Sequence, residues 1–233
     1  MKKLITIILS LLILISTQLA CSKSEVLVYA PDGAPALSLS SLINENVKNV
    51  KVNIVSSDKI QSLVTGSDKK ADVCILPINM ASKLIGSGDD YKMLGTITHG
   101  NFYFMSSTDM ELSATSLNSL IGKTIGVMQL QNVPGITLRC VLNSYNVPYG
   151  IIEDTTNKYN DKVNLMAINK VETARTDIDL FLIPSPQADA KAQTTSLKFV
   201  GSLSELYGEN GFPQAIVVVK NTLIEDNLKL VKK

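Results

Sequence analysis

Residues 122–138, GKTIGVMQLQNVPGITL, predict a β-strand, a short turn and the start of an α-helix. The apolar run at 125–128 is typical of a buried strand. Pro134 stands near the start of the helix, where its missing backbone N–H is least harmful. Residues 26–35, VLVYAPDGAP, show the same order of strand, turn and proline-led helix near the other end of the chain. Each copy begins a run of alternating strands and helices, so we expect two α/β lobes.

The alternation continues through most of the chain. The expected strands lie at 25–30, 50–56, 72–76, 92–98, 101–106, 123–129, 150–153, 179–183, 198–203 and 214–219. The expected helices run from the first turn through 42, over 58–64, 79–85 and 134–146, and from 184 to 191, with a polar loop at 155–161. This order predicts an α/β fold with mostly parallel sheets.

The composition is that of a folded protein with a substantial core. Apolar residues make up 45% of the 233 residues and charged residues 18%, which argues against global disorder. The formal net charge is +1 and no basic run occurs outside the extreme termini, so nucleic acid is not an expected partner.

The N-terminus has the three parts of an export signal. Lys2 and Lys3 precede an apolar run at 4–15, and a short polar tail ends in Ala20. Cys21 follows, which resembles the bacterial lipoprotein signal, although Gln18 stands where that signal prefers an aliphatic residue. We expect a signal peptide at 1–20 and a tether at 21–24, lipidated on Cys21 by acyl chains such as palmitate. A permanent N-terminal anchor helix is the alternative.

The common signatures of catalysis and metal binding are missing from the sequence. It contains no GxSxG, HExxH or GxxxxGK[ST] motif, and His99 is its single histidine. Cys74 and Cys140 have no CxxC partner, so a metal site is not expected, although a disulfide between them stays open. We therefore expect a protein that is not an enzyme and that needs no cofactor or metal.

Four turns follow expected strands and could meet a ligand. They lie at 31–36, 76–79, 129–132 and 184–187. Ligands of open α/β sheets bind beyond the carboxyl ends of the strands, where helix starts present free N–H groups. The alternative for each turn is a simple helix cap. Tyr207 and Phe212 could stack on a planar ligand or only pack their loop.

Five tracts together resemble the solute-binding proteins of ABC transporters. They are YAPDGAPAL at 29–37, ADVCILPINMASKL at 71–84, THGNFY at 98–103, GKTIGVMQLQNVPGITL at 122–138 and FPQAIVVVKNTLIEDN at 212–227. They are most similar to the class II periplasmic-binding-protein group that includes nitrate, sulfonate and thiamine-pyrimidine binders. The resemblance implies two lobes, 25–106 with 215–233 and 107–214. Two crossover strands near 102–107 and 215–219 would join them around a clamped ligand.

The resemblance also implies a set of ligand contacts. The expected ligand-binding residues are Asp32, Gly33, Ala34, Pro77, Asn79, Gly100, Asn101, Gln129, Asn132, Pro184 and Ser185. Relatives carry a Gly-Glu-Pro-like turn where this chain has residues 183–186, so the second-lobe contacts depart from the pattern. Relatives also continue with helices that complete the first lobe. This sequence stops at Lys233, which indicates a fragment or a first lobe shortened at its C-terminal end.

The function implied is capture of a small solute for an ABC permease in the membrane. The protein would be exported and held on the outer face of the cell membrane by its lipid anchor. Asp32 is the one clear charge among the expected contacts, which favours a neutral or cationic solute such as a nitrogen heterocycle. Two alternatives are an enzyme on the same scaffold, acting on a pyrimidine or amine precursor, and a surface adhesin without a cleft.

Overall fold

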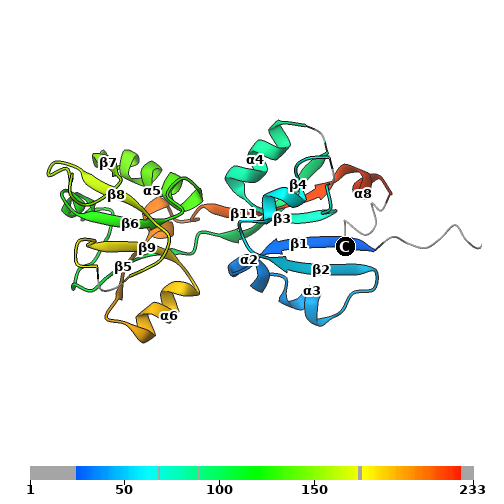
Figure 1. Cartoon of the computed structure of the whole chain (residues 1–233), viewed down its shortest axis with the longest axis horizontal. Helices are drawn as coiled ribbons and strands as arrows, with labels where there is room; N and C mark the ends of the chain where they lie inside the picture. Colours follow the sequence, from blue (N-terminus) through cyan, green and yellow to red (C-terminus); the bar gives the residue numbers. More distant parts are fainter. Residues whose placement is uncertain (1–24, 68, 89, 173–174, 227–233) are drawn as a thin grey trace, which may run out of the picture.

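The computed structural model describes residues 25–67, 69–88, 90–172 and 175–226. These residues form two mixed α/β lobes that lie side by side along the longest axis of the molecule (Figure 1). The expected α/β architecture with mostly parallel strands is confirmed. The expected signal peptide at 1–20, the acylated Cys21 and the chain end at Lys233 lie outside the described residues. No described helix is long and apolar enough to span a bilayer.

The first lobe contains a sheet of five strands in the order β2-β1-β3-β11-β4. Its strands are β1 (Val26–Pro31), β2 (Val50–Val55), β3 (Val73–Pro77), β4 (Tyr91–His99) and β11 (Pro213–Lys220). β1 pairs in parallel with β2 and β3, whereas β11 runs antiparallel between β3 and β4. A strand from the C-terminal part of the chain therefore belongs to the sheet of the first lobe.

Short helices cover this sheet. They are α2 (Ala34–Leu37), α3 (Ser40–Asn44), the 3-10 helix η1 (Ile60–Leu63), α4 (Ile78–Gly86) and α8 (Asn221–Asp226). The single helix expected through residue 42 is broken into α2 and α3. At the break the hydroxyl of Ser38 donates to the carbonyl of Pro35 at 2.6 Å, a local bond that competes with helical hydrogen bonding.

The second lobe contains a sheet of six strands in the order β10-β5-β9-β6-β8-β7. Its strands are β5 (Phe102–Ser106), β6 (Thr124–Met128), β7 (Tyr149–Ile152), β8 (Val163–Ile168), β9 (Leu180–Pro184) and β10 (Lys198–Ser202). The helices of this lobe are η2 (Leu117–Leu120), α5 (Val133–Ser144), α6 (Gln187–Thr194) and α7 (Leu203–Tyr207). β6, β8, β9 and β7 are parallel, and β5 runs antiparallel to both of its neighbours.

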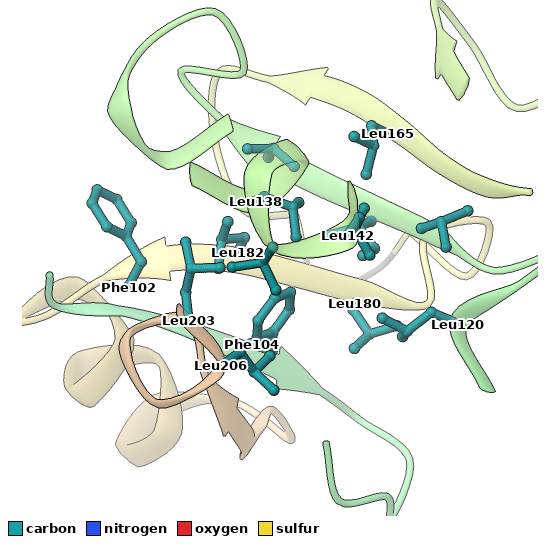
Figure 2. Close-up of a cluster of buried hydrophobic side chains, with 14 of the residues drawn as sticks. Phe102, Phe104, Leu120, Leu138, Leu142, Leu165, Leu180, Leu182, Leu203 and Leu206 are labelled. Carbon is teal, nitrogen blue, oxygen red and sulfur yellow. The ribbon is translucent and has the colours of Figure 1, made fainter. Parts of the chain in front are cut away.

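The core of the second lobe lies between its sheet and helices α5 and α7. Figure 2 shows Leu138 and Leu142 of α5 above Leu182 of β9, with Phe104 and Leu203 below. All five side chains are buried. Burial of a leucine or phenylalanine side chain contributes about 1.5 to 3 kcal/mol, so this cluster fixes α5 firmly on the sheet.

The strand β8 has no counterpart among the expected elements. Asn164 interrupts its apolar run and obscures the strand pattern. In the structure this amide is fully buried and satisfied within the lobe. Its oxygen accepts from the backbone N–H of Tyr159 at 2.7 Å, and its nitrogen donates to the Tyr159 carbonyl at 3.0 Å. A buried amide with such partners is compatible with a central strand.

Each lobe contains the same kind of hydrogen-bonded ring, formed by an aspartate just before one strand and a residue of the neighbouring strand. In the first lobe Asp72 accepts from the N–H of Leu27 at 3.0 Å, and its own N–H donates to the Leu27 carbonyl at 3.0 Å. In the second lobe Asp179 forms the same two bonds with Thr124, at 2.8 and 3.0 Å. The aspartates lie just before β3 and β9, so the echo seen in the sequence extends to a matched local structure.

The chain passes between the sheets twice. It leaves β4 at His99 and enters the second sheet at Phe102, then returns to the first sheet at Pro213. The expected boundary between 106 and 107 is therefore too late, because β5 pairs with β9 and β10. The expected return boundary between 214 and 215 also lies after the observed one, because Pro213 already belongs to β11. The crossovers expected near 102–107 and 215–219 overlap β5 and β11, whereas the chain crosses just before each of these strands.

The two crossings are held against each other. The N–H of Gly100 donates to the carbonyl of Phe212 at 2.8 Å. A Cβ atom at Gly100 would lie 2.3 Å from the Phe212 ring, so only glycine fits there without displacing a buried side chain. We call the contact of Gly100 with Phe212 the hinge, because the chain crosses between the lobes there.

The aspartate rings can be tested lobe by lobe. Asp179→Ala removes the acceptor of the Thr124 N–H, and Asp72→Ala removes that of Leu27. We expect each variant to lose about 1 to 2 kcal/mol in unfolding free energy, measured by urea titration. We also expect faster amide hydrogen exchange at the orphaned N–H in the affected lobe alone. Asp161→Ala, at an exposed loop residue, is the control; equal exchange in all three variants would contradict the role of the rings.

Candidate ligand-binding site between the lobes

A hollow of about 200 Å³ lies where the two lobes meet. The first lobe supplies Ile78 and Asn79 from the first turn of α4. This turn follows β3 directly, so the sheet places both side chains at the carboxyl edge of its central strand. Ile78 packs against the buried apolar clusters of both lobes and joins them.

One face of α5 forms the opposite wall. Val133, Ile136, Thr137 and Cys140 stand at helical spacing and all line the hollow. Residues three and four apart share a helix face, so this wall is a continuous stripe. The other face carries the buried Leu138, Val141 and Leu142 of the lobe core. The helix therefore has two apolar faces, one packed in its lobe and one turned to the hollow.

The hinge side of the hollow is aromatic. Tyr207 ends α7, and Phe212 and Pro213 lead into β11. The rings of Tyr207 and Phe212 meet edge to face, with centroids 5.6 Å apart and an interplanar angle of 61°. Phe212 is buried, whereas Tyr207 is about half exposed. Phe212 therefore belongs both to the hinge and to the wall of the hollow.

Two amide side chains join the lobes beside the hollow. Nδ2 of Asn79 donates to Oδ1 of Asn132 at 3.2 Å. Asn132 is the N-cap residue of α5, so the starts of α4 and α5 face each other across the gap. Oδ1 of Asn79 is buried and has no hydrogen-bond partner within the described part of the chain. A buried acceptor without a partner is unusual in a folded protein.

The expected residues after β1 lie on the same edge of the first sheet. Asp32 and Gly33 follow the strand, and Ala34 begins α2. Gly33 has a φ of 85°, in the left-handed region that favours glycine. The carboxylate of Asp32 is exposed and accepts from the hydroxyl of Ser57 at 2.8 Å. Pro77 ends β3 next to them.

Asn101 and Ser185 pair with each other in the second lobe. Nδ2 of Asn101 donates to the Ser185 carbonyl at 2.7 Å, and the Ser185 N–H donates to the Asn101 carbonyl at 2.9 Å. The Ser185 hydroxyl donates to Asp189. Pro184 ends β9 just before this pair. These bonds extend the pairing of β5 with β9 toward the hinge, where Gly100 lies.

The turn after β6 is shaped by its backbone. Gln129 has a φ of 59°, and the N–H of Asn132 donates to its carbonyl at 2.8 Å. A Cβ at Gly135 would lie 1.9 Å from the carbonyl oxygen of Leu130, so glycine lets this turn fold tightly over the start of α5. Gln129 itself is exposed.

Of the expected ligand-binding residues, Asn79 alone lines the hollow. Asn132 contacts it through the amide pair, and the ligand role of the others stays a prediction. Ile78 lies within the expected turn at 76–79, whereas five other wall residues were not among the expected contacts: Val133, Ile136, Thr137, Cys140 and Pro213. The second apolar stripe of α5 was the available signal, because a helix that is apolar on two faces needs a second partner surface.

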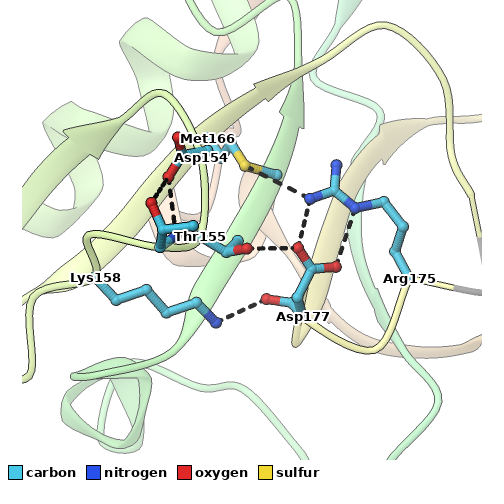
Figure 3. Close-up of polar contacts among 7 residues, drawn as sticks. Asp154, Thr155, Lys158, Met166, Arg175 and Asp177 are labelled. Carbon is cyan, nitrogen blue, oxygen red and sulfur yellow. Dashed lines mark hydrogen bonds and ion pairs between the residues drawn. The ribbon is translucent and has the colours of Figure 1, made fainter.

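Figure 3 shows a charged cluster of the second lobe, and its residues are not part of the lining of the hollow. Arg175 donates to Asp177 at 2.6 Å, and the Thr155 hydroxyl donates to the same carboxylate at 2.7 Å. These hydrogen bonds hold the pKa of Asp177 well below its usual range. Lys158 donates to the Asp177 backbone carbonyl at 2.7 Å, so the cluster ties two loops together.

The acidic, histidine and cysteine side chains do not form a metal site in the described residues, where no three of them are gathered. His99 is exposed at the end of β4. Cys74 is buried and Cys140 exposed, and both thiols are free. Burial raises the pKa of Cys74 to about 12, because the charged thiolate is disfavoured in apolar surroundings.

No family model and no curated protein matches the chain in sequence. Solved structures do match its fold. A protein described as an ABC transporter from Parabacteroides distasonis aligns with a TM-score of 0.64 and 19% identity, over 90% of this chain and 71% of that one. The aliphatic sulphonate binding protein SsuA from Escherichia coli aligns with a TM-score of 0.63 and 12% identity, over 91% of this chain and 66% of that one.

A third similar structure is the Candida albicans CA3427 gene product, which is described as having the generic periplasmic binding protein fold. It aligns with a TM-score of 0.53 and 10% identity, over 89% of this chain and 67% of that one. At these identities the likeness concerns the fold. The expected class of architecture is confirmed, and the chain has the fold of periplasmic binding proteins.

Proposed function

We propose that the protein is the extracytoplasmic substrate-binding component of an ABC importer and captures a small solute between its lobes. The observation that supports this most is the hollow shared by α4 and α5. Its walls come from both lobes, so a solute bound there would contact both at once. Solute binding would then favour one arrangement of the lobes over others, which is the signal that a permease can read.

The similar structures support the same role. Their descriptions name an ABC transporter and a sulphonate binding protein. Each match covers about nine-tenths of this chain. On this proposal the partners are a small solute and a membrane permease. The export signal at 1–20 and acylation of Cys21 would hold the protein on the outer face of the membrane, and the sequence favours a nitrogen heterocycle as solute.

The proposal predicts a bound small molecule. The full-length protein is purified, denatured, and the released compounds are identified by mass spectrometry. The compound is then added back to refolded protein in a calorimeter. We expect saturable one-to-one binding and a rise in Tm with solute concentration, since a ligand of the folded state stabilises it by about 2.7 kcal/mol at 100 times its Kd. Folded protein that releases no compound, and binds none from cell extracts, would contradict the proposed function.

Cys140 offers an independent probe of the hollow. The full-length native protein is treated with iodoacetamide and the labelled peptides are mapped by mass spectrometry. We expect Cys140 to react and Cys74 to stay unlabelled, because Cys74 is buried and its pKa is raised to about 12.

Added solute should slow the labelling of Cys140 by covering the wall on which it stands. Cys140→Ser is the control that identifies the reactive peptide. If the identified solute binds while Cys140 reacts at an unchanged rate, the solute lies elsewhere and the hollow is not the binding site.

A further inference from the structure

The hollow leaves large apolar side chains exposed. Ile136 is 37% exposed and Tyr207 is 49% exposed, and both line the hollow together with the exposed Cys140. The other apolar residues of α5 are buried in the core of their lobe. Exposed apolar surface that is gathered in a concave place is typical of ligand-binding sites. The surface formed by Ile136 and Tyr207 is therefore available to an occupant.

The Tyr207 ring is supported from behind. Phe212 is buried and meets it edge to face, with the ring centroids 5.6 Å apart. Phe212 in turn lies against the backbone of Gly100, where a Cβ atom would be only 2.3 Å from the ring. The turn between the two rings is closed by the N–H of Gly211, which donates to the carbonyl of Gly208 at 2.9 Å. A ring supported in this way loses less conformational entropy when a solute covers it.

The lining of the hollow carries no charge. Among the described residues that form its walls there is no lysine, arginine, histidine, aspartate or glutamate. Arg139 stands on α5 outside the lining, and its Nε donates to the carbonyl of Gly135 at 3.1 Å. An ion that enters the hollow would give up part of its hydration without gaining a counter-ion from the walls, which is unfavourable. The walls therefore favour an uncharged group.

The size of the hollow suits a single ring. Its volume is about 200 Å³, and an apolar cavity of about 150 Å³ is enough to bind benzene. Ile78 of the first lobe and Ile136 of the second contribute apolar surface from the two sides. A flat six-membered ring therefore fits between the lobes in contact with Tyr207.

We propose that the hollow binds an uncharged planar ring of the solute, and that Tyr207 recognises this ring by aromatic contact while Phe212 supports Tyr207. This specificity rests on the proposed function, because it concerns the same site. Aromatic rings attract each other in offset-stacked or edge-to-face arrangements, and a saturated ring of the same size lacks this attraction. Tyr207 is thus the residue that distinguishes a planar solute from a non-planar one.

Three small probes test the proposal: phenol, cyclohexanol and benzenesulfonate. Phenol and cyclohexanol have the same number of heavy atoms and one hydroxyl each, and both are uncharged at neutral pH, but only phenol is planar. Benzenesulfonate is planar and carries a negative charge. Their affinities for the full-length protein are measured by ligand-observed NMR titration. We expect phenol to bind about two- to tenfold more tightly than cyclohexanol, the effect of one aromatic contact. Benzenesulfonate should bind more weakly than phenol.

Three variants locate the preference. Tyr207→Leu keeps apolar bulk but removes the ring, and should make the affinities of phenol and cyclohexanol equal. Phe212→Leu leaves Tyr207 in place without its aromatic support, and should reduce the preference for phenol. Tyr145→Leu is the matched control, because Tyr145 is 39% exposed on the same lobe but does not line the hollow. It should leave the preference unchanged. Circular dichroism checks that each variant is folded.

Several results would overturn the proposal. These are equal binding of phenol and cyclohexanol to the unaltered protein, tighter binding of benzenesulfonate than of phenol, no binding of any probe, or a preference for phenol that Tyr207→Leu retains. An unchanged preference in Phe212→Leu would contradict the supporting role of Phe212. If a charged or non-planar compound released from the purified protein binds tightly and protects Cys140, the solute class proposed here is wrong while the capture function stands. If neither probes nor released compounds bind, both proposals fail.

Discussion

The contact between Gly100 and Phe212 is the constraint on which the two-lobed structure depends. Both crossings between the sheets pass through it, and the hydrogen bond of 2.8 Å holds them together. Because a Cβ of residue 100 would lie only 2.3 Å from the Phe212 ring, the two segments approach more closely than a residue with a side chain at position 100 would allow. The same ring forms a wall of the hollow, so the hinge and the hollow share one side chain.

The lobes that meet at this hinge are built on one plan. Each has parallel strands that begin at an aspartate ring, Asp72 with Leu27 and Asp179 with Thr124. Each also has a helix that follows a strand and reaches the gap: α4 starts directly after β3, and α5 starts after the short turn that follows β6. Strand ends and helix starts from both halves thus face one space. This is the arrangement in which α/β proteins bind ligands.

Much of the fold could be predicted from the sequence, because short apolar runs and proline-led turns punctuate it. The ends of β1, β3, β6 and β9 were placed within a residue or two. The strand β8 was missed because Asn164 breaks its pattern, and its burial depends on loop atoms around Tyr159 that local sequence does not reveal. The lobe boundaries came too late because the pairing of β5 with β9 is a long-range contact.

The site was less predictable than the fold. The turn residues were chosen because helix starts often bind ligands, and Asn79 does line the hollow. The other wall residues are apolar, such as Val133 and Ile136, and apolar residues on a helix are usually read as core. Which of the two apolar faces of α5 packs in its lobe depends on where the sheet lies, and that is decided by tertiary structure.

The central claim is that the starts of α4 and α5 face each other across the gap between the lobes. The most direct test is a cross-link between Asn79→Cys and Asn132→Cys by a short bis-maleimide, in a chain with Cys21 and Cys140 replaced by serine. The amide tips of the two native side chains meet at 3.2 Å, so a short linker can span the two thiols, and we expect a joined peptide that contains residues 79 and 132 in mass spectrometry. Folded protein in which both thiols react with the reagent but the two peptides are never joined would contradict the account.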